Sequence, residues 1–337
     1  MLNFDEKRFL RIQTQAVALA PGIDELIRAK LRDGAKSVVF LGAGGAGILM
    51  EPAYDLLRLD STFPAFLERP AELVRTGSTR IDESSIVVIP SLSGTTGESI
   101  AVLDVARAAG ATIVTLTGDP SSPLAVAGDA TFTVEAADDT SSETFFVQSL
   151  LIALSIMNAR GERDDYSTIV EELAALPQAL LEAKRTFEPR AERLAEQLQG
   201  IEYQLITAAG NAWAEAWYFG MCILEEMQWI RTRPIHAADF FHGTLELVEK
   251  GVDVLILKGE DASRPVVERV ERFAPRVTNR LVVIDTKDFA LAGISDGTRS
   301  LVSPVVLATV LERLSAHLEI ARRHPLVTRR YYRRLDY

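Results

Sequence analysis

Short apolar segments recur in the second half of this chain at nearly the spacing they have in the first half. Tyr203–Ile206 stands about 165 residues after Val38–Leu41, and two further pairs are offset by about 167 and about 169 residues. These pairs are Ile86–Ile89 with Asp253–Leu257, and Thr112–Leu116 with Leu281–Ile284. Each segment is mostly apolar and precedes a helix-like stretch, as a strand buried on both faces does. The repeat predicts an α/β fold with two copies of one unit, each with a mainly parallel sheet.

Composition limits the possible partners. The formal net charge of −11 over 337 residues argues against nucleic acid or an anionic membrane as partner, because both bind clustered positive charge. Cys222 is the only cysteine and the four histidines lack metal-ligand spacing, so we expect no disulfide and no metal site. The longest apolar run, near Phe145–Met157, is broken by polar residues, and no signal-like segment opens the chain. We therefore expect a cytoplasmic protein with a small-molecule ligand.

Breaks in composition divide the chain into five parts. Two N-terminal helices separated at Pro21 and Gly22 are expected before the first repeat, and polar helices punctuated by Pro177 and Pro189 are expected between the repeats. The predicted parts are 1–34 (N-terminal helices), 35–163 (first α/β domain), 164–199 (linking helices), 200–321 (second α/β domain) and 322–337 (C-terminal tail).

The stretch Ser84–Ser99 has the features of a phosphate-binding loop. The apolar run Ile86–Ile89 predicts a strand, Ala101–Ala109 predicts a helix, and small hydroxyl residues and glycines join them. The hydroxyl residues are Ser91, Ser93, Thr95 and Thr96, and they surround Gly94. Hydroxyls and free backbone N–H groups at a helix N-terminus stabilise a phosphate dianion. An ordinary capped turn is the alternative, but a cap needs only one hydroxyl. Because the second repeat lacks such a cluster, the phosphate site is expected in the first repeat only.

A glycine-rich loop follows the first predicted strand. Gly42 to Gly47 match the dinucleotide fingerprint Gly-x-Gly-x-x-Gly, and Glu68 stands after a possible second strand at Thr62–Leu67. The match is weak because a doubly wound sheet also needs glycine wherever a ligand or a helix approaches its backbone closely. Gly44 and Gly45 are therefore candidate ligand contacts.

An apolar helix is predicted from Asn211, its capping residue, to the carboxylate pair Glu225 and Glu226. The helix is apolar nearly all round, which predicts burial. A carboxylate at the end of a buried helix tends to have a raised pKa, which suits acid–base catalysis, although the helix could instead emerge into solvent there. His242 follows two phenylalanines, and its default interpretation is a core histidine with a satisfied hydrogen bond.

Together these residues resemble the sugar isomerase (SIS) domain family. The Ser91–Glu98 loop is similar to the family's phosphosugar signature, and the duplicated architecture resembles the isomerase half of glucosamine-6-phosphate synthase and, more closely, the fructoselysine-6-phosphate deglycases. In the family a helix ends in a catalytic glutamate, and sixteen residues later a histidine begins a His-Gly-Pro motif. Glu226 and His242 have that separation here, followed by Gly243, but Thr244 replaces the proline. The resemblance covers essentially the whole chain.

The resemblance implies two tandem doubly wound, flavodoxin-like SIS domains with helices on both faces of each sheet. It implies a deglycase that cleaves a 6-phosphorylated fructosamine, an amino acid joined to a ketose, to an aldose 6-phosphate and a free amine, without a metal or redox cofactor. His242 would assist ring opening and Glu226 would move a proton, with the phosphate on the Ser91–Thr96 loop. Glu143 stands near the position of a synthase lysine, where it could meet a substrate amine or simply be solvated, and Tyr337 resembles a terminal tyrosine of the deglycases. The alternatives are an aldose–ketose or amino-sugar phosphate isomerase and a non-catalytic sugar-phosphate-binding protein.

The resemblance also implies assembly. SIS proteins pair so that a histidine of one subunit can complete the neighbour's site, and Ala237–Leu247, with Phe240 and Phe241, would suit burial between the subunits of a homodimer or higher homo-oligomer. The C-terminal tail carries six arginines and neighbouring tyrosines on an acidic protein. We expect this tail to fold back over the body, where its arginines pair with acidic groups or attract an anionic substrate.

Overall fold

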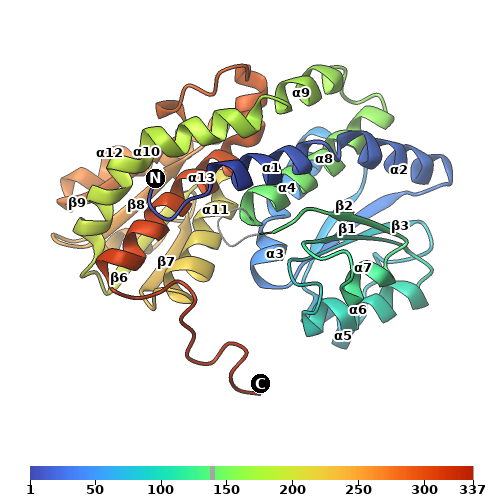
Figure 1. Cartoon of the computed structure of the whole chain (residues 1–337), viewed down its shortest axis with the longest axis horizontal. Coiled ribbons are helices and arrows are strands. Elements are labelled where there is room, and N and C mark those ends of the chain that lie inside the picture. The colour runs from blue at the N-terminus through green and yellow to red at the C-terminus, as the bar shows by residue number, and fades with distance from the viewer. Residues whose placement is uncertain (137–140, 337) are drawn as a thin grey trace. The chain divides into compact units, whose positions relative to one another are not determined.

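The computed structural model describes residues 1–136 and 141–336 (Figure 1). Contacts divide the chain into two compact units. The first unit is Lys7–Pro177, and the second combines Met1–Glu6 with Gln178–Tyr337. Each unit has its own sheet and its own hydrophobic core.

The sheet of the first unit has strand order β2-β1-β3-β4-β5, and all of its neighbouring strands are parallel. Its strands are β1 (Ser37–Leu41), β2 (Ala65–Glu68), β3 (Ser85–Ser91), β4 (Thr112–Thr117) and β5 (Ala130–Thr133). The central strands β1 and β3 are buried along their whole length, which is why they read as continuous apolar runs in the sequence.

Helices cover both faces of this sheet. Its helices are α1 (Glu6–Val17), α2 (Ala20–Arg32), α3 (Gly44–Ile48), α4 (Glu51–Asp60), α5 (Pro70–Thr76), α6 (Gly97–Ala108), α7 (Pro123–Ala127), α8 (Ser141–Ala159) and α9 (Tyr166–Leu173). Figure 1 shows α2, α4 and α8 on one side of the sheet and α5, α6 and α7 on the other. On the second side, Val39 and Val87 pack against Leu73 of α5 and Val102 of α6 in one buried cluster.

The sheet of the second unit has strand order β7-β6-β8-β9, again parallel throughout. Its strands are β6 (Tyr203–Ala208), β7 (Arg231–His236), β8 (Asp253–Lys258) and β9 (Arg280–Asp285). This order reproduces that of β2-β1-β3-β4, and each strand begins 166 or 168 residues after its counterpart, as Tyr203 does after Ser37 and Asp253 after Ser85. The predicted duplication and the doubly wound α/β fold are therefore confirmed.

Strand β7 is absent from the sequence-based prediction. Its sequence, Arg-Thr-Arg-Pro-Ile-His, is polar and contains Pro234, so it has neither an apolar run nor regular alternation. It lies at the edge of the sheet and pairs only with β6. An edge strand tolerates proline and needs less burial, because one side of its backbone has no strand partner.

The helices of the second unit include a rare form. They are α10 (Leu176–Leu198), α11 (Ala212–Tyr218), a π-helix (Phe219–Glu225), α12 (Arg264–Phe273) and α13 (Asp296–Ala321), with short 3₁₀ turns at Thr244–Leu247, Ala274–Arg276 and Thr286–Asp288. The predicted continuous helix from Asn211 to Glu226 is thus α-helical only in its first half. Gly220 permits the close packing of the π-helix on β7, because a Cβ there would lie 2.8 Å from the Pro234 ring.

Several details of this region correct the prediction. Asn211 occupies the N-cap of α11, but its side chain donates to the Ser300 carbonyl instead of capping the helix. The helix is not buried all round, since Trp213 and Trp217 are half-exposed and stack on each other with centroids 6.2 Å apart. Glu215, on the same helix, is buried.

Proline does not divide the helices where the sequence suggested. Pro189 lies inside α10 without ending it, and Pro177 stands near the start of that helix. In the N-terminal pair, the break falls at Ala18 and Leu19, so that Pro21 lies in the first turn of α2, where its missing N–H is not needed.

Two described helices, Ser141–Ala159 (α8) and Asp296–Ala321 (α13), are long and apolar enough to span a membrane. In each of them 83% of the apolar window is buried inside the protein. Such burial is what the core helix of a soluble protein shows, so length and composition alone give only weak evidence for a membrane span.

Candidate functional site

The Ser/Thr loop lies between the end of β3 and the start of α6, as predicted. Ser91 is the last residue of β3, and its hydroxyl lies 3.0 Å from the hydroxyl of Thr96, the N-cap residue of α6. The Ser93 hydroxyl accepts hydrogen bonds from the Thr95 backbone N–H at 3.3 Å and the Thr95 hydroxyl at 2.9 Å. Within the described chain, the Thr96 side chain caps no N–H of α6. The loop therefore holds hydroxyls in two pairs beside the positive end of a twelve-residue helix.

Gly94 fixes the path of this loop. Its φ of +61° lies in the left-handed region, and a Cβ added there would meet the Ser122 hydroxyl oxygen at 2.0 Å. Its carbonyl accepts from the Leu124 N–H at 3.1 Å, which ties the loop to the start of α7. Only glycine fits this position without a shift of α7.

The glycine-rich loop after β1 is explained by helix packing. A Cβ on Gly42 would lie 2.2 Å from the Cα of Gly47, so these two glycines let the backbone of α3 lie directly against the end of β1. Gly44 is exposed and has a φ of +54°. Since β1 and β3 are neighbouring parallel strands, Gly44 and Gly45 leave the same edge of the sheet as the Ser/Thr loop. Glu68 accepts hydrogen bonds from Ser78 and Arg80.

The matching edge of the second unit is acidic and internally paired. Asp261 accepts from the backbone N–H groups of Asn211 and Ser263, and Asp285 binds Arg264 and Lys258. These contacts hold the pKa of Asp285 down to about 2, although its burial acts in the opposite direction. A phosphate at this edge would meet carboxylates. The phosphate site expected in the first repeat only stays a prediction.

Glu226 follows the π-helix as its C-cap residue, and its carboxylate is bound by the C-terminal tail. The Arg329 Nε donates to Glu226 Oε1 at 2.9 Å, and the two side chains are 19% and 33% exposed. The tail thus folds back onto the body of the second unit, as predicted. Neither side chain is fully buried. The end of the helix is therefore partly exposed, whereas either full burial or emergence into solvent was predicted from the sequence.

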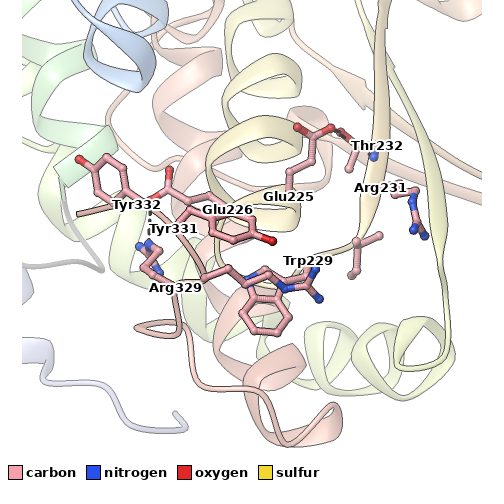
Figure 2. Close-up of a pocket in the computed structure, with 10 residues that line it drawn as sticks. Glu225, Glu226, Trp229, Arg231, Thr232, Arg329, Tyr331 and Tyr332 are labelled. Atoms are coloured by element: carbon pink, nitrogen blue, oxygen red, sulfur yellow. Dashed lines mark hydrogen bonds and ion pairs between the residues drawn. The ribbon is translucent and has the colours of Figure 1, made fainter. Parts of the chain in front are cut away.

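A cavity of about 710 Å³ surrounds this ion pair (Figure 2). It is lined by Glu225, Glu226, Trp229, Ile230, Arg231, Thr232, Arg329, Arg330, Tyr331 and Tyr332. The Arg330 guanidinium lies 3.9 Å from the centroid of the Trp229 ring, a cation–π contact that packs the tail against the wall. Charged and aromatic groups thus line the cavity together.

Glu225 and Cys222 take structural positions beside Glu226. Figure 2 shows the Glu225 side chain directed to Thr232, and its carboxylate accepts from the Thr232 hydroxyl at 2.5 Å and from its N–H at 3.2 Å. Burial raises the pKa of the Cys222 thiol to about 12, and the nearby carboxylates, Glu226 first among them, add to the shift. This thiol stays protonated at neutral pH and cannot serve as a nucleophile.

His242 is exposed, and its ring makes no hydrogen bond within the described part of the chain. The default interpretation as a satisfied core histidine is therefore wrong. Phe240 is fully buried in the unit's own core, where it packs edge-on against Phe241 and Phe273. The expectation that Phe240 is buried between subunits is thus also wrong, because the chain itself covers it.

The remaining predicted residues lie elsewhere. Glu143 is fully buried in the first turn of α8, where the Ser142 hydroxyl donates to it at 3.3 Å, so the solvated alternative is wrong. Tyr337 lies outside the described residues. Among the described residues, no cluster of histidine, cysteine or carboxylate side chains could hold a metal ion.

Glu51 is a perturbed carboxyl group that sequence reasoning missed. It begins α4, and its Oε2 is buried with no hydrogen-bond partner in the described structure. Burial raises the pKa of Glu51 to about 7, Asp55 adds to the shift, and Arg69 opposes it. The only sequence signal is its place shortly after the glycine-rich loop.

Comparison with known proteins identifies the family. A family model of the SIS domain matches residues 33–159, which include every strand of the first unit. The fructoselysine 6-phosphate deglycase of Escherichia coli is 30% identical over 253 residues, which cover 75% of this chain and 72% of that protein. The chain belongs to the SIS family. The resemblance drawn from the Ser91–Glu98 loop is thereby confirmed.

Other SIS relatives cover nearly the whole chain. The fructosamine deglycase FrlB of Bacillus subtilis is 28% identical over 302 residues, or 89% of this chain and 92% of that protein. A solved structure from Bacillus subtilis, described as a candidate phosphosugar isomerase, has a TM-score of 0.87 at 27% identity and covers 96% of this chain and 99% of its own. The C-terminal domain of glucosamine-fructose-6-phosphate aminotransferase from Francisella tularensis shares the fold, with a TM-score of 0.82, 18% identity and 95% coverage of both chains.

Proposed function

We propose that this SIS-family protein is a deglycase, which hydrolyses the 6-phosphorylated fructosamine of an amino acid to an aldose 6-phosphate and a free amine. The coarser part of this statement, a sugar-phosphate enzyme of the SIS family, rests on curated relatives that are deglycases and on matched structures described as phosphosugar isomerases. The proposal of deglycase activity in particular is carried by the relatives with 28% and 30% identity, because both are deglycases. We further propose a cytoplasmic location.

In the proposed site the phosphate binds to the hydroxyls of Ser91, Ser93 and Thr96 and to backbone N–H groups around Gly94. Two features of the loop support this role. Hydroxyls converge on the N-terminus of α6, and the left-handed Gly94 keeps side-chain bulk out of the turn. Gly44 and Gly45, at the same sheet edge, are proposed to approach the sugar. Binding the phosphate fixes the position of the reacting carbons.

The proposed chemistry is proton transfer followed by hydrolysis. Glu226 removes a proton from C1, the carbon that bears the nitrogen, while the C2 carbonyl oxygen gains a proton, which gives an enaminol. Return of a proton to C2 gives a protonated imine between C1 and the nitrogen. Water then adds to C1 and the C–N bond breaks, releasing the amine and the aldose 6-phosphate. A positioned general base contributes roughly 10²–10⁴-fold to such a reaction.

His242 is proposed to assist opening of the sugar ring. Its ring is exposed and without a hydrogen bond in the described structure, as suits a group that meets a substrate or a second subunit. We propose that the protein forms at least a homodimer in which His242 completes the neighbour's site. Sedimentation at micromolar concentration tests this: a fully active monomer would exclude the arrangement.

The experiment that tests the function is a screen of 6-phosphorylated fructosamines for release of free amine. The closest alternative is an aldose–ketose or amino-sugar phosphate isomerase, which would use the same residues without hydrolysis. Analysis of the products separates the two, because only a deglycase releases the amine. Turnover of a sugar phosphate with no amine among the products would establish the isomerase, and no turnover of either class would favour a non-catalytic binding protein.

A further inference from the structure

The guanidinium of Arg329 is held in place but only partly used. Its Nε donates to Glu226 Oε1 at 2.9 Å, and its Nη1 donates to the carbonyls of Leu326 at 2.6 Å and Thr328 at 3.0 Å. Its Nη2 has no hydrogen-bond partner among the described residues, although the side chain is only 19% exposed. Three contacts therefore fix the orientation of the group while one amino group remains available in the cavity wall.

The charges around the cavity favour an anion at that position. Arg231 and Arg330 line the same wall and form no ion pair with any described residue. Of the two acidic groups of the wall, Glu226 is paired with Arg329, whereas Glu225 accepts from the neutral Thr232 hydroxyl and keeps its charge. The lining has three arginines against two carboxylates. The cavity therefore has an excess of positive charge beside the proposed base, even though the chain as a whole carries a net charge of −11.

We propose that Arg329 is the residue that recognises a carboxylate on the amine portion of the substrate, through its free Nη2. This inference rests on the proposed function and adds to it the residue that recognises the carboxylate of the amino-acid portion. One guanidinium then bridges two carboxylates, that of the substrate on Nη2 and that of Glu226 on Nε. Guanidinium binds carboxylate in such planar, charge-assisted contacts, which are stronger than neutral hydrogen bonds.

The bridge has a consequence for positioning. Because the same guanidinium holds the base and the substrate, a carboxylate on Nη2 lies at a fixed place relative to the Glu226 oxygens. A substrate without the carboxylate loses this contact, and water binds the Nη2 group in its place. A charge-assisted hydrogen bond of this kind corresponds to about a ten- to hundredfold preference for the carboxylated substrate.

Two matched pairs of substrates test the proposal. The first pair is the 6-phosphorylated fructosamine of glycine and that of methylamine, which differ only by the carboxylate. The second pair, linked through the terminal amine, uses lysine and pentane-1,5-diamine. Rates of amine release are measured for the wild type, Arg329→Gln, Arg329→Lys and the control Arg334→Gln. Arg334 is an exposed arginine of the same tail and does not line the cavity.

We expect the wild type to prefer the carboxylated member of at least one pair by ten- to hundredfold in kcat/KM. Arg329→Gln should bring that ratio close to one, mainly by raising KM for the carboxylated substrate, Arg329→Lys should keep part of the preference, and Arg334→Gln should keep all of it. The ratio is the informative readout, because a purely structural effect on Glu226 lowers both rates equally.

Each other outcome overturns the proposal. If the wild type processes both members of each pair equally well, the proposed carboxylate contact is refuted while the deglycase function stands. This comparison uses the wild type alone, so it does not depend on whether a variant folds. An equal loss for both members in Arg329→Gln and Arg329→Lys makes Arg329 structural. Release of amine from none of the four compounds by the wild type removes the deglycase function and the inference together.

Discussion

Replacing Gly94 with alanine tests how the Ser/Thr loop holds its shape. A non-glycine residue in the left-handed region costs about 1–2 kcal/mol, and Gly94 has a φ of +61°. The new Cβ would also lie 2.0 Å from the Ser122 hydroxyl oxygen and 2.4 Å from the Ser122 Cβ, so Ser122 or the loop must move.

Movement of Ser122 has a further cost. This residue is the N-cap of α7, where its hydroxyl accepts from the Ala125 N–H at 3.3 Å, and losing a cap costs about 1 kcal/mol. Together these effects should lower the free energy of unfolding of Gly94→Ala by about 2–4 kcal/mol. The KM for a sugar phosphate should rise as well, since the loop is the proposed phosphate site.

Urea unfolding followed by circular dichroism measures the change in stability, and Gly97→Ala is the matched control. Gly97 begins α6, has no positive φ, and would place a Cβ with nothing within 4 Å, so its replacement should change stability by less than about 0.5 kcal/mol. Ser122→Gly removes both clashing atoms, and glycine at an N-cap costs only a few tenths of a kcal/mol.

The double variant Gly94→Ala/Ser122→Gly should therefore be about 1–2 kcal/mol more stable than the sum of the single changes predicts, because the collision disappears and only the backbone strain remains. Additive effects would refute this account of the loop. A Gly94→Ala protein as stable as the wild type would do so too.

Three further predictions concern Glu226, Glu51 and the tail. Glu226→Gln should lower kcat for amine release at least about a hundredfold with little change in KM, whereas Glu225→Gln, which can still accept from Thr232, should retain most of the activity; the reverse result would reassign the base. Glu51 binds its proton up to about pH 7 in the folded protein but only up to its ordinary value of 4.5 when unfolded, so it lowers stability as pH rises between these values. Above pH 7 the free energy of unfolding of Glu51→Gln, measured with urea, should therefore exceed that of the wild type by up to about 3 kcal/mol. The difference should disappear toward pH 4.5, and a difference independent of pH would contradict the proposed effect of Glu51 ionisation. Deleting Thr328–Tyr337 removes the Arg329 partner of Glu226 and should lower activity or stability in the same assays, and a truncated protein equal to the wild type in both would contradict a functional tail.

The fold was predictable because its central strands are buried on both faces. β1, β3, β4, β6 and β8 each leave an apolar, β-branched run in the sequence. β7 leaves no such run because an edge strand has less to bury, and its residues Arg231 and Arg233 read as loop. The π-helix was not predictable either, since its hydrogen bonding does not alter the apolar composition of Phe219–Glu225.

Local sites were easier to predict than distant contacts. The hydroxyl loop is continuous in sequence, so its place at the start of α6 followed from the strand and helix on either side. The pairing of Glu226 with Arg329 joins residues 103 positions apart, and no pattern in either segment indicates it. The roles of Glu226, His242 and the Ser/Thr loop remain predictions. The solvated alternative for Glu143 was wrong, because Glu143 is fully buried. Whether a single carboxylate on a helix is buried depends on the segments that pack over it, which the local sequence does not indicate.

The π-helix makes Phe219–Glu225 a place where the chain can change in length. A π-helix has one residue more per hydrogen-bonded ring than an α-helix, as in the bond from the Glu226 N–H to the Met221 carbonyl. Removing one residue there would convert that turn to α-helix, with α11 before it and β7 after it left in place. In related genes, single-codon insertions and deletions should therefore be found in this segment more readily than in the helices around it.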